Sequence, residues 1–170
     1  MRTPVAEELT PSVSHRPTED DPMAAVSRWL SRASYDPATT LALWAAGETA
    51  PLLVGREWRL VRIDFTPATA AVTGLRARRR HIGPYLMGGA EHAMWWLLPL
   101  GEESASGSVA GFPGVTPYPK GSELFAPPPG KYLGDRVWVL PDPAEGQWAT
   151  LTAAAELREA LEAARAARPA

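Results

Sequence analysis

The stretch Ile82–Gly101, IGPYLMGGAEHAMWWLLPLG, decides the fold that this sequence predicts. Two apolar runs, Tyr85–Met87 and Ala93–Leu98, flank a pair of glycines, and glycine permits the positive φ angles of a tight turn. The stretch therefore predicts a β-hairpin. Large apolar residues occupy both alternating faces of the second arm. We therefore expect that arm to be a central strand, covered on both sides at least in part.

His92 opens the second arm of this hairpin, directly after the glycine turn. In a strand it would share a face with Met94 and Trp96, while Trp95 would lie on the opposite face. A histidine at the mouth of a buried strand is a place where a functional site can be built. The alternative is a histidine that only caps the turn or faces solvent, and the sequence leaves both interpretations open.

The composition favours one domain, because 170 residues with 45% hydrophobic content and seven tryptophans suffice for a core. A net charge of −2 gives no global field that draws the chain to nucleic acid or anionic lipid. The lack of cysteine excludes disulfides and thiolate zinc sites, and three histidines argue against a multi-histidine metal site. Since no apolar run suits a membrane helix or a signal peptide, we expect a cytoplasmic protein with no membrane contact.

Proline and acidic residues are frequent in residues 1–20, which predicts a disordered tail, and residues 21–168 then form a single domain. Aspartate accepts backbone hydrogen bonds at a helix start and proline suits the first helical position, so an Asp-Pro pair marks a start. Helices are expected from Asp21-Pro22, from Asp36-Pro37, over about Pro67–Arg80 and over about Thr152–Ala167.

Short runs rich in apolar residues predict the remaining strands. These runs are Pro51–Val54, Glu57–Phe65, Glu123–Ala126 and Arg136–Leu140. Combined with the hairpin and the helices, they predict an α+β fold in which helices flank a mixed, largely antiparallel sheet.

Asp64 lies near the end of the strand expected over residues 57–65. An acid in that place either presents a carboxylate to a metal or caps the next helix. The dipeptide Thr66-Pro67 already starts that helix well, which leaves Asp64 available for another role.

Arg76, Arg79 and Arg80 lie at i, i+3 and i+4 near the end of the third helix, so they form one basic patch. Such a patch can neutralise phosphates. The alternative is a solvated helix end, because cations favour the negative C-terminal end of the helix dipole. Two other classes of site are absent: no serine lies in a strand–Ser–helix elbow, and Gly130-Lys131 lacks the upstream glycine of a P-loop.

Four segments in order resemble a known family, the N-terminal domain of bifunctional DNA primase/polymerases (prim-pol), in its small actinobacterial versions. The segments are DPATTLALWAAG from Asp36, EWRLVRIDF from Glu57, GGAEHAMWWLLPLG from Gly88 and GSELFAPPPGKYLGDRVWVLPD from Gly121. The resemblance covers roughly residues 36–142 and implies a prim-pol-like core related to the RRM fold.

The chemistry that this resemblance implies is nucleotidyl transfer, in which paired carboxylates hold two divalent metals. Asp64 matches one acid of the family's Asp-x-Asp motif, but Thr66 stands where the second acid is expected, or Arg62 if Asp64 is itself the second acid. The segment Ala90-Glu91-His92 matches a motif whose histidine contacts nucleotide phosphates. The third acidic motif has no counterpart in Val115–Tyr118. Strand alternation predicts that Glu91 points away from His92.

We therefore expect a degenerate, catalytically inactive relative that binds a nucleotide, nucleic acid or a protein partner, with weak affinity for nucleic acid. Asp64 is its vestigial metal ligand, and its expected phosphate contacts are His92, Arg76, Arg79, Arg80, Lys120 and Lys131. One alternative is an active nucleotidyltransferase whose Mg²⁺ or Mn²⁺ site is completed by Glu91, Glu123 or another chain; no cofactor is expected otherwise. The second alternative is a protein-interaction domain with no nucleotide site.

Overall fold

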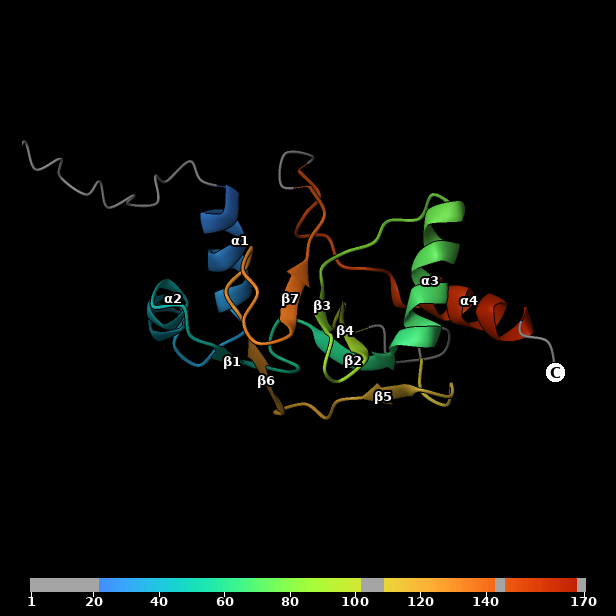
Figure 1. Ribbon diagram of the computed structural model, residues 1–170, viewed down its shortest axis with the longest axis horizontal. Helices are drawn as coiled ribbons and strands as arrows, with labels where there is room; N and C mark the ends of the chain where they lie inside the picture. Colours follow the sequence, from blue (N-terminus) through green and yellow to red (C-terminus); the bar gives the residue numbers. More distant parts are fainter. Residues whose placement is uncertain (1–21, 102–108, 143–145, 168–170) are drawn as a thin grey trace, which may run out of the picture.

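The structure is a computed structural model that describes residues 22–101, 109–142 and 146–167, so the tail expected over residues 1–20 lies outside the described residues. The elements follow one another along the chain as Figure 1 shows. They are α1 (Pro22–Ser31), α2 (Pro37–Ala45), β1 (Ala50–Leu53), β2 (Arg59–Asp64), α3 (Phe65–Ala77), β3 (Tyr85–Gly88), β4 (Ala93–Leu98), β5 (Val115–Pro117), β6 (Glu123–Ala126), β7 (Arg136–Val139) and α4 (Ala154–Ala166).

The strands form a five-stranded sheet in the order β5-β2-β4-β3-β7 and a two-stranded sheet of β1 and β6. The predicted α+β class with a largely antiparallel sheet is confirmed. Every strand pair in the described part of the chain is antiparallel, so the mixed character that we expected is absent there. Strand β5 was not predicted, because three residues that end in proline carry too little pattern.

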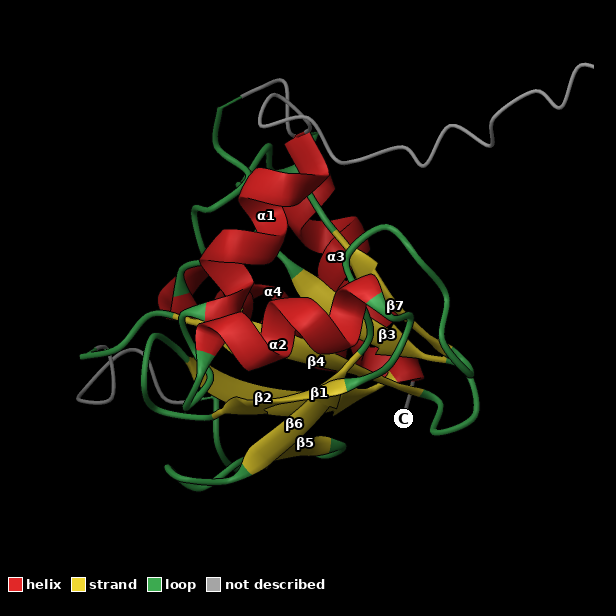
Figure 2. Ribbon diagram, turned by 90° about the vertical axis from the view of Figure 1, so that its left-hand side faces the viewer, coloured by secondary structure: helices red, strands yellow, loops and turns green. Residues whose placement is uncertain are grey.

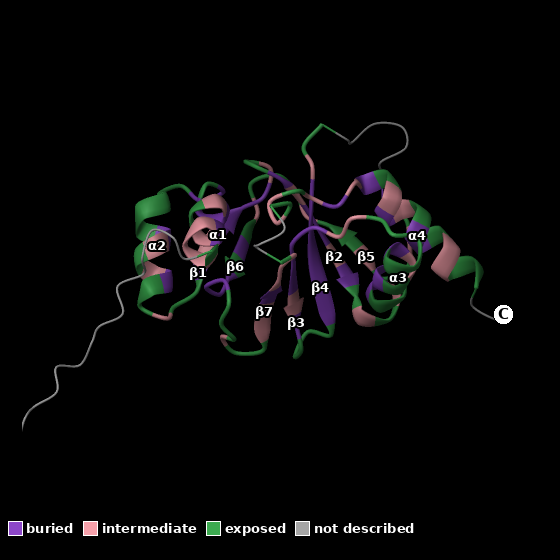
Figure 3. Ribbon diagram, turned by 90° about the horizontal axis from the view of Figure 1, so that it is seen from above, coloured by how far each residue is buried: buried purple, intermediate pink, exposed green. Residues whose placement is uncertain are grey.

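Strand β4 is the centre of the larger sheet, as the hairpin stretch predicts, and all six of its residues are buried. Trp95 is 2% exposed and Trp96 is fully buried, and alternation puts the two rings on opposite faces. Helices α3 and α4 cover the Trp96 face. Helices α1 and α2 and the two-stranded sheet cover the Trp95 face, so the sheet lies between two layers (Figures 2 and 3).

Strands β2 and β3, on either side of α3 in the chain, are both antiparallel to β4 and therefore run parallel to each other with β4 between them. This arrangement is a split β-α-β unit. Strand β5 extends it beyond β2, β7 extends it beyond β3, and α4 packs beside α3.

Two element boundaries differ from the prediction for a backbone reason. Helix α3 ends at Ala77 rather than Arg80, and Arg79 beyond it has a positive φ of 55°. Strand β4 begins at Ala93, so His92 belongs to the turn, with a φ of 50°. A positive φ ends regular helix or strand geometry for an L-residue.

Candidate functional site

One end of the larger sheet carries the residues of interest in a single row. Cross-strand pairing joins Asp64 to Ala93, Ala93 to Gly88, and Gly88 to Arg136. Paired residues of antiparallel strands point to the same face, so these four residues, the end row, share the face that carries α1 and α2. The acidic residue Asp64 and the basic residue Arg136 therefore lie at the two ends of this row, with the small residues Ala93 and Gly88 between them.

Asp64 ends β2 and precedes α3. It occupies the N-cap position of α3, but its side chain makes no capping hydrogen bond to the helix. Its backbone N–H donates to the carbonyl of Gly114 at 2.9 Å, and its carboxylate is exposed. The backbone of Asp64 is thus fixed at the sheet end while its carboxylate remains open to solvent.

The turn between β3 and β4 presents His92 beside this carboxylate. Its φ of 50° lies in the left-handed region, where histidine is enriched among non-glycine residues. The carbonyl of His92 accepts a hydrogen bond from the N–H of Phe65 at 2.8 Å. The imidazole meets the Phe65 ring edge-on, with 5.7 Å between ring centroids. These two contacts tie the turn to the start of α3.

Asp64, Phe65, Thr66, Glu91 and His92 line one hollow of about 420 Å³, which we call the Asp64–His92 hollow. The structure therefore brings together the two vestigial site residues that the sequence predicts, with Thr66 beside them. Strand alternation does not decide where Glu91 points, because Glu91 and His92 lie in the turn rather than in β4. Their contacts differ: the Glu91 carboxylate accepts hydrogen bonds from Arg136, whereas the His92 ring meets Phe65.

Arg136 is a residue of this region that the sequence reasoning missed. Its Nη2 and Nε donate to Glu91 Oε1 at 3.0 and 3.3 Å, and its Nη1 donates to the carbonyl of Phe125 at 2.7 Å. Its guanidinium carbon lies 4.6 Å from the centre of the Trp95 ring. The available signal was a basic residue that opens the otherwise apolar strand RVWV, but nothing in the sequence indicates its partner.

Arg62 approaches the same turn from the other side of the hairpin. Its Nη2 donates to the backbone carbonyl of Glu91 at 3.1 Å. Its Nε is buried and has no hydrogen-bond partner among the residues that the structure describes. Glu91 is thus held by two arginines, through its carbonyl by Arg62 and through its carboxylate by Arg136.

The other basic residues that the sequence proposed as phosphate contacts lie elsewhere. The basic patch begins at Arg76, about 18 Å along α3 from Asp64 at 1.5 Å per residue. Arg80 pairs with Glu156 of α4 at 3.6 Å. Arg76 lies near Tyr85, where its charge opposes the burial that raises the pKa of the Tyr85 phenol. The basic patch is therefore separate from the Asp64–His92 hollow.

Lys120 and Lys131 belong to two further places. The Lys120 side chain passes Gly55 in the turn between β1 and β2, so closely that a Cβ on Gly55 would lie 2.5 Å from it. Lys131 lines a hollow of about 370 Å³ against α1 and α2. Glu123 lies on β6 of the smaller sheet, opposite Leu53, rather than in the Asp64–His92 hollow.

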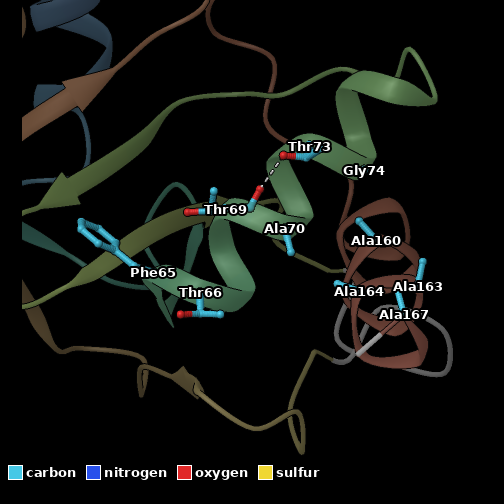
Figure 4. A pocket seen from close by; sticks show the side chains of 10 residues that line it. All are labelled: Phe65, Thr66, Thr69, Ala70, Thr73, Gly74, Ala160, Ala163, Ala164 and Ala167. Atoms are coloured by element: carbon cyan, nitrogen blue, oxygen red, sulfur yellow. Dashed lines mark hydrogen bonds between the residues drawn. The ribbon is translucent and has the colours of Figure 1, made fainter. Parts of the chain in front are cut away.

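A longer apolar groove of about 780 Å³ runs between α3 and α4 (Figure 4). Small side chains such as Ala160 and Ala164 form its α4 side, and the Thr73 hydroxyl donates to the carbonyl of Thr69 at 3.0 Å on its α3 side. Phe65 and Thr66 line both this groove and the Asp64–His92 hollow. The two cavities are therefore neighbours at the start of α3.

Within the described ranges, histidine, aspartate and glutamate side chains form no group of three or more that could hold a metal ion. Mg²⁺ is often held by one or two carboxylates together with the phosphates of a substrate. Asp64 fits that more limited role. None of the helices described is long and apolar enough to cross a membrane.

Comparison of the chain with models of known protein families, with curated proteins and with solved structures found no match. The residues and their geometry therefore carry the functional argument.

Proposed function

We propose that this chain is a prim-pol-like domain that binds a nucleotide through its phosphates and does not transfer nucleotides. The meeting of Asp64 and His92 in one hollow carries the proposal. These are the residues that match the first acidic motif and the histidine motif of the family that the sequence resembles. The split β-α-β unit around β4 is consistent with an RRM-related core.

The chemistry of the hollow suits a phosphate that arrives with a divalent cation, because the carboxylates of Asp64 and Glu91 line it together with His92. An imidazole N–H donates to phosphate oxygens, and the neighbouring carboxylate of Asp64 can take up one divalent cation that arrives with the phosphates. The left-handed backbone of His92 is a further argument, because strained residues of this kind gather at ligand sites.

Catalysis is not part of the proposal because the carboxylates for two metals are lacking. In-line nucleotidyl transfer uses two cations roughly 3.5–4 Å apart, each anchored by protein carboxylates. Asp64 has Thr66 where its partner acid is expected, and β5 carries Val115-Thr116-Pro117 in place of the third acid. Glu91 lines the same hollow, but its carboxylate is bound to Arg136.

The test is a titration with nucleoside triphosphates, with and without Mg²⁺ or Mn²⁺, followed by thermal denaturation. A ligand at a hundred times its Kd stabilises the native state by about 2.7 kcal/mol. We expect this stabilisation in the wild type and its loss in His92→Ala. The matched control is His81→Ala, because His81 lies beyond the far end of α3, with its ring bound to the carbonyl of Thr150 at 2.8 Å. Absence of stabilisation by every nucleotide at millimolar concentration would contradict the proposal.

Primer extension separates the proposal from an active nucleotidyltransferase, the alternative that the position of Glu91 in the hollow favours. We expect no incorporation with either metal. Metal-dependent incorporation that disappears in Asp64→Ala would show that the hollow is an active site and would make Glu91 the first candidate for the second carboxylate. A protein-interaction domain without a nucleotide site would fail both assays.

A further inference from the structure

The carboxylate of Glu91 lies where the end row leaves space. Gly88 has no side chain there, and a Cβ built on it would lie 2.5 Å from Glu91 Oε2 and 2.6 Å from Trp95 Cζ3. The next residue of the row, Ala93, adds only a methyl group. The Glu91 carboxylate therefore fits over the sheet because Gly88 and Ala93 beneath it have no side chain or only a methyl group.

Two arginines contact Glu91, one through its carboxylate and one through its backbone carbonyl. Arg136 directs two of its N–H groups at one oxygen of the Glu91 carboxylate. Arg62, one row further into the sheet on the same face, extends toward the turn and still has a buried Nε without a partner in the described ranges. The guanidinium of Arg136 is itself fixed by Phe125 and by the Trp95 ring beneath it. The fixed guanidinium of Arg136, with a second arginine nearby, is the kind of group that binds an oxyanion.

Glu91 and Arg136 are partly open to solvent, with side chains 37% and 26% exposed. An ion pair of this exposure is weak and exchanges with ions from solution. A carboxylate and a phosphoryl group offer similar pairs of oxygens to a guanidinium, so one can replace the other. A ligand anion can therefore reach Arg136 if Glu91 moves away.

We propose that the Glu91 carboxylate occupies an anion-binding site on Arg136, beside Arg62, and that a phosphoryl group of the ligand binds there by displacing it. Glu91 is then an internal competitor that weakens binding in the resting protein. The inference rests on the proposed function for the nature of the anion, because Glu91 also lines the Asp64–His92 hollow and links the two places. A nucleotide phosphate would extend from His92 toward Arg136.

The size of the effect follows from the competition. The affinity that is measured equals the intrinsic affinity reduced by the fraction of molecules in which Arg136 is free. For a partly exposed ion pair, we expect removal of the competing charge to tighten phosphate binding about fivefold. Removal of Arg136 has the opposite sign, and we expect at least about a tenfold loss because a charge-assisted fork is lost.

The experiment measures the affinity of the full chain for inorganic phosphate and for a nucleoside triphosphate at constant ionic strength, by calorimetry and by tryptophan fluorescence. Trp95, under Arg136, provides the optical signal. The variants are Glu91→Gln, Arg136→Gln and the double variant. The matched control is Glu162→Gln, which breaks a pair with Arg158 of the same 3.0 Å length on the surface of α4. A thermal melt of each variant verifies that it is folded.

We expect Glu91→Gln to bind both ligands more tightly, Arg136→Gln to bind both more weakly, and the control to match the wild type. An unchanged or weaker affinity in Glu91→Gln overturns the inference, and so does a gain that persists in the double variant, since the gain must depend on Arg136. The proposed function is judged separately, by the loss of triphosphate binding in His92→Ala. Tighter binding of inorganic phosphate alone in Glu91→Gln would support the anion site and overturn the assignment of nucleotide as its ligand.

Discussion

Replacement of His92 by glycine and by alanine separates the backbone role of this residue from the role of its imidazole. With a φ of 50°, a non-glycine residue here is held in the left-handed region, and glycine adopts that region without strain. Both substitutions remove the imidazole from the Asp64–His92 hollow. They differ in backbone strain and in the entropy of the unfolded chain.

The expected stabilities follow from three contributions. The left-handed conformation costs a residue with a Cβ about 1–2 kcal/mol. Glycine avoids this cost, but its greater conformational freedom in the unfolded chain lowers the stability of the folded state by about 0.4–1 kcal/mol. Loss of the edge-on contact with Phe65, at 5.7 Å between centroids, costs both variants about 0.5–1.5 kcal/mol. We therefore expect His92→Ala to be less stable than the wild type by about 1 kcal/mol and His92→Gly to be close to the wild type.

Urea unfolding followed by tryptophan fluorescence gives these differences from the midpoints at constant slope. Nucleotide binding, measured by thermal shift, should be lost equally in both variants. Arg79 is the matched control, because its φ of 55° is also positive but it lies beyond the far end of α3. Arg79→Gly should likewise be more stable than Arg79→Ala, with nucleotide binding unchanged in both.

Two results would refute this reasoning. If His92→Gly is less stable than His92→Ala, the turn does not need the left-handed conformation at this position. If His92→Gly retains the affinity of the wild type, the imidazole does not contact the ligand, and the strain at His92 serves only the turn. Loss of nucleotide binding in the Arg79 variants would instead show that the basic patch contacts the phosphates.

Three further outcomes concern the sheet and the first helices. Gly88→Ala should destabilise the domain by about 1–3 kcal/mol in urea, because the new Cβ would lie 2.6 Å from Cζ3 of the buried Trp95 ring; unchanged stability would mean that this ring does not lie against Gly88. Trp96→Ala should cost about 3–5 kcal/mol, because the ring is fully buried, and a loss below about 1 kcal/mol would contradict a central β4. The pKa of Asp36 is lowered, mainly because the Thr39 hydroxyl donates a hydrogen bond to its carboxylate. The stability that this carboxylate adds is therefore present above its unfolded pKa and is lost as the pH falls through its folded pKa. The Tm difference between the wild type and Asp36→Asn should therefore shrink on acidification, and a difference that grows in acid would contradict the cap.

The fold was predictable where local pattern and burial agree. The hairpin stretch indicates β4 as a doubly covered strand because its apolar residues leave no face for solvent, and the structure confirms this. Asp36 was predictable as a cap because Asp-Pro is a local signal, and its carboxylate accepts from the N–H groups of Ala38 and Thr39. Strand β5 was not predictable, because Val115–Pro117 is a strand only through its pairing with β2.

The site was predictable only in part, for a related reason. Asp64 and His92 could be named from the sequence because each follows from a strand end and a turn. The environment of Glu91 depends on the register of β3 with β4 and with β7, because this register places Arg136 beside Gly88. The register between strands that are distant in the sequence has no local signal. For the same reason the sequence grouped Lys120 and Lys131 with His92, although the fold separates them.

The end row relates the proposed anion binding and the expected lack of nucleotidyl transfer to one geometry. Asp64 and Gly88 lie two strand spacings apart, about 9–10 Å. The Glu91 carboxylate lies over Gly88 and is hydrogen-bonded to Arg136. Two metals at bridging distance need carboxylates only a few ångströms apart, so Glu91 cannot serve Asp64 while it neutralises Arg136. An anion that takes Arg136 frees Glu91, so the two acids can then approach one cation, whereas transfer requires two cations that are each anchored by carboxylates. A nucleotide triphosphate should therefore stabilise the wild type more in the presence of Mg²⁺ than in its absence, and Glu91→Gln should lose this increment while it gains affinity for phosphate alone.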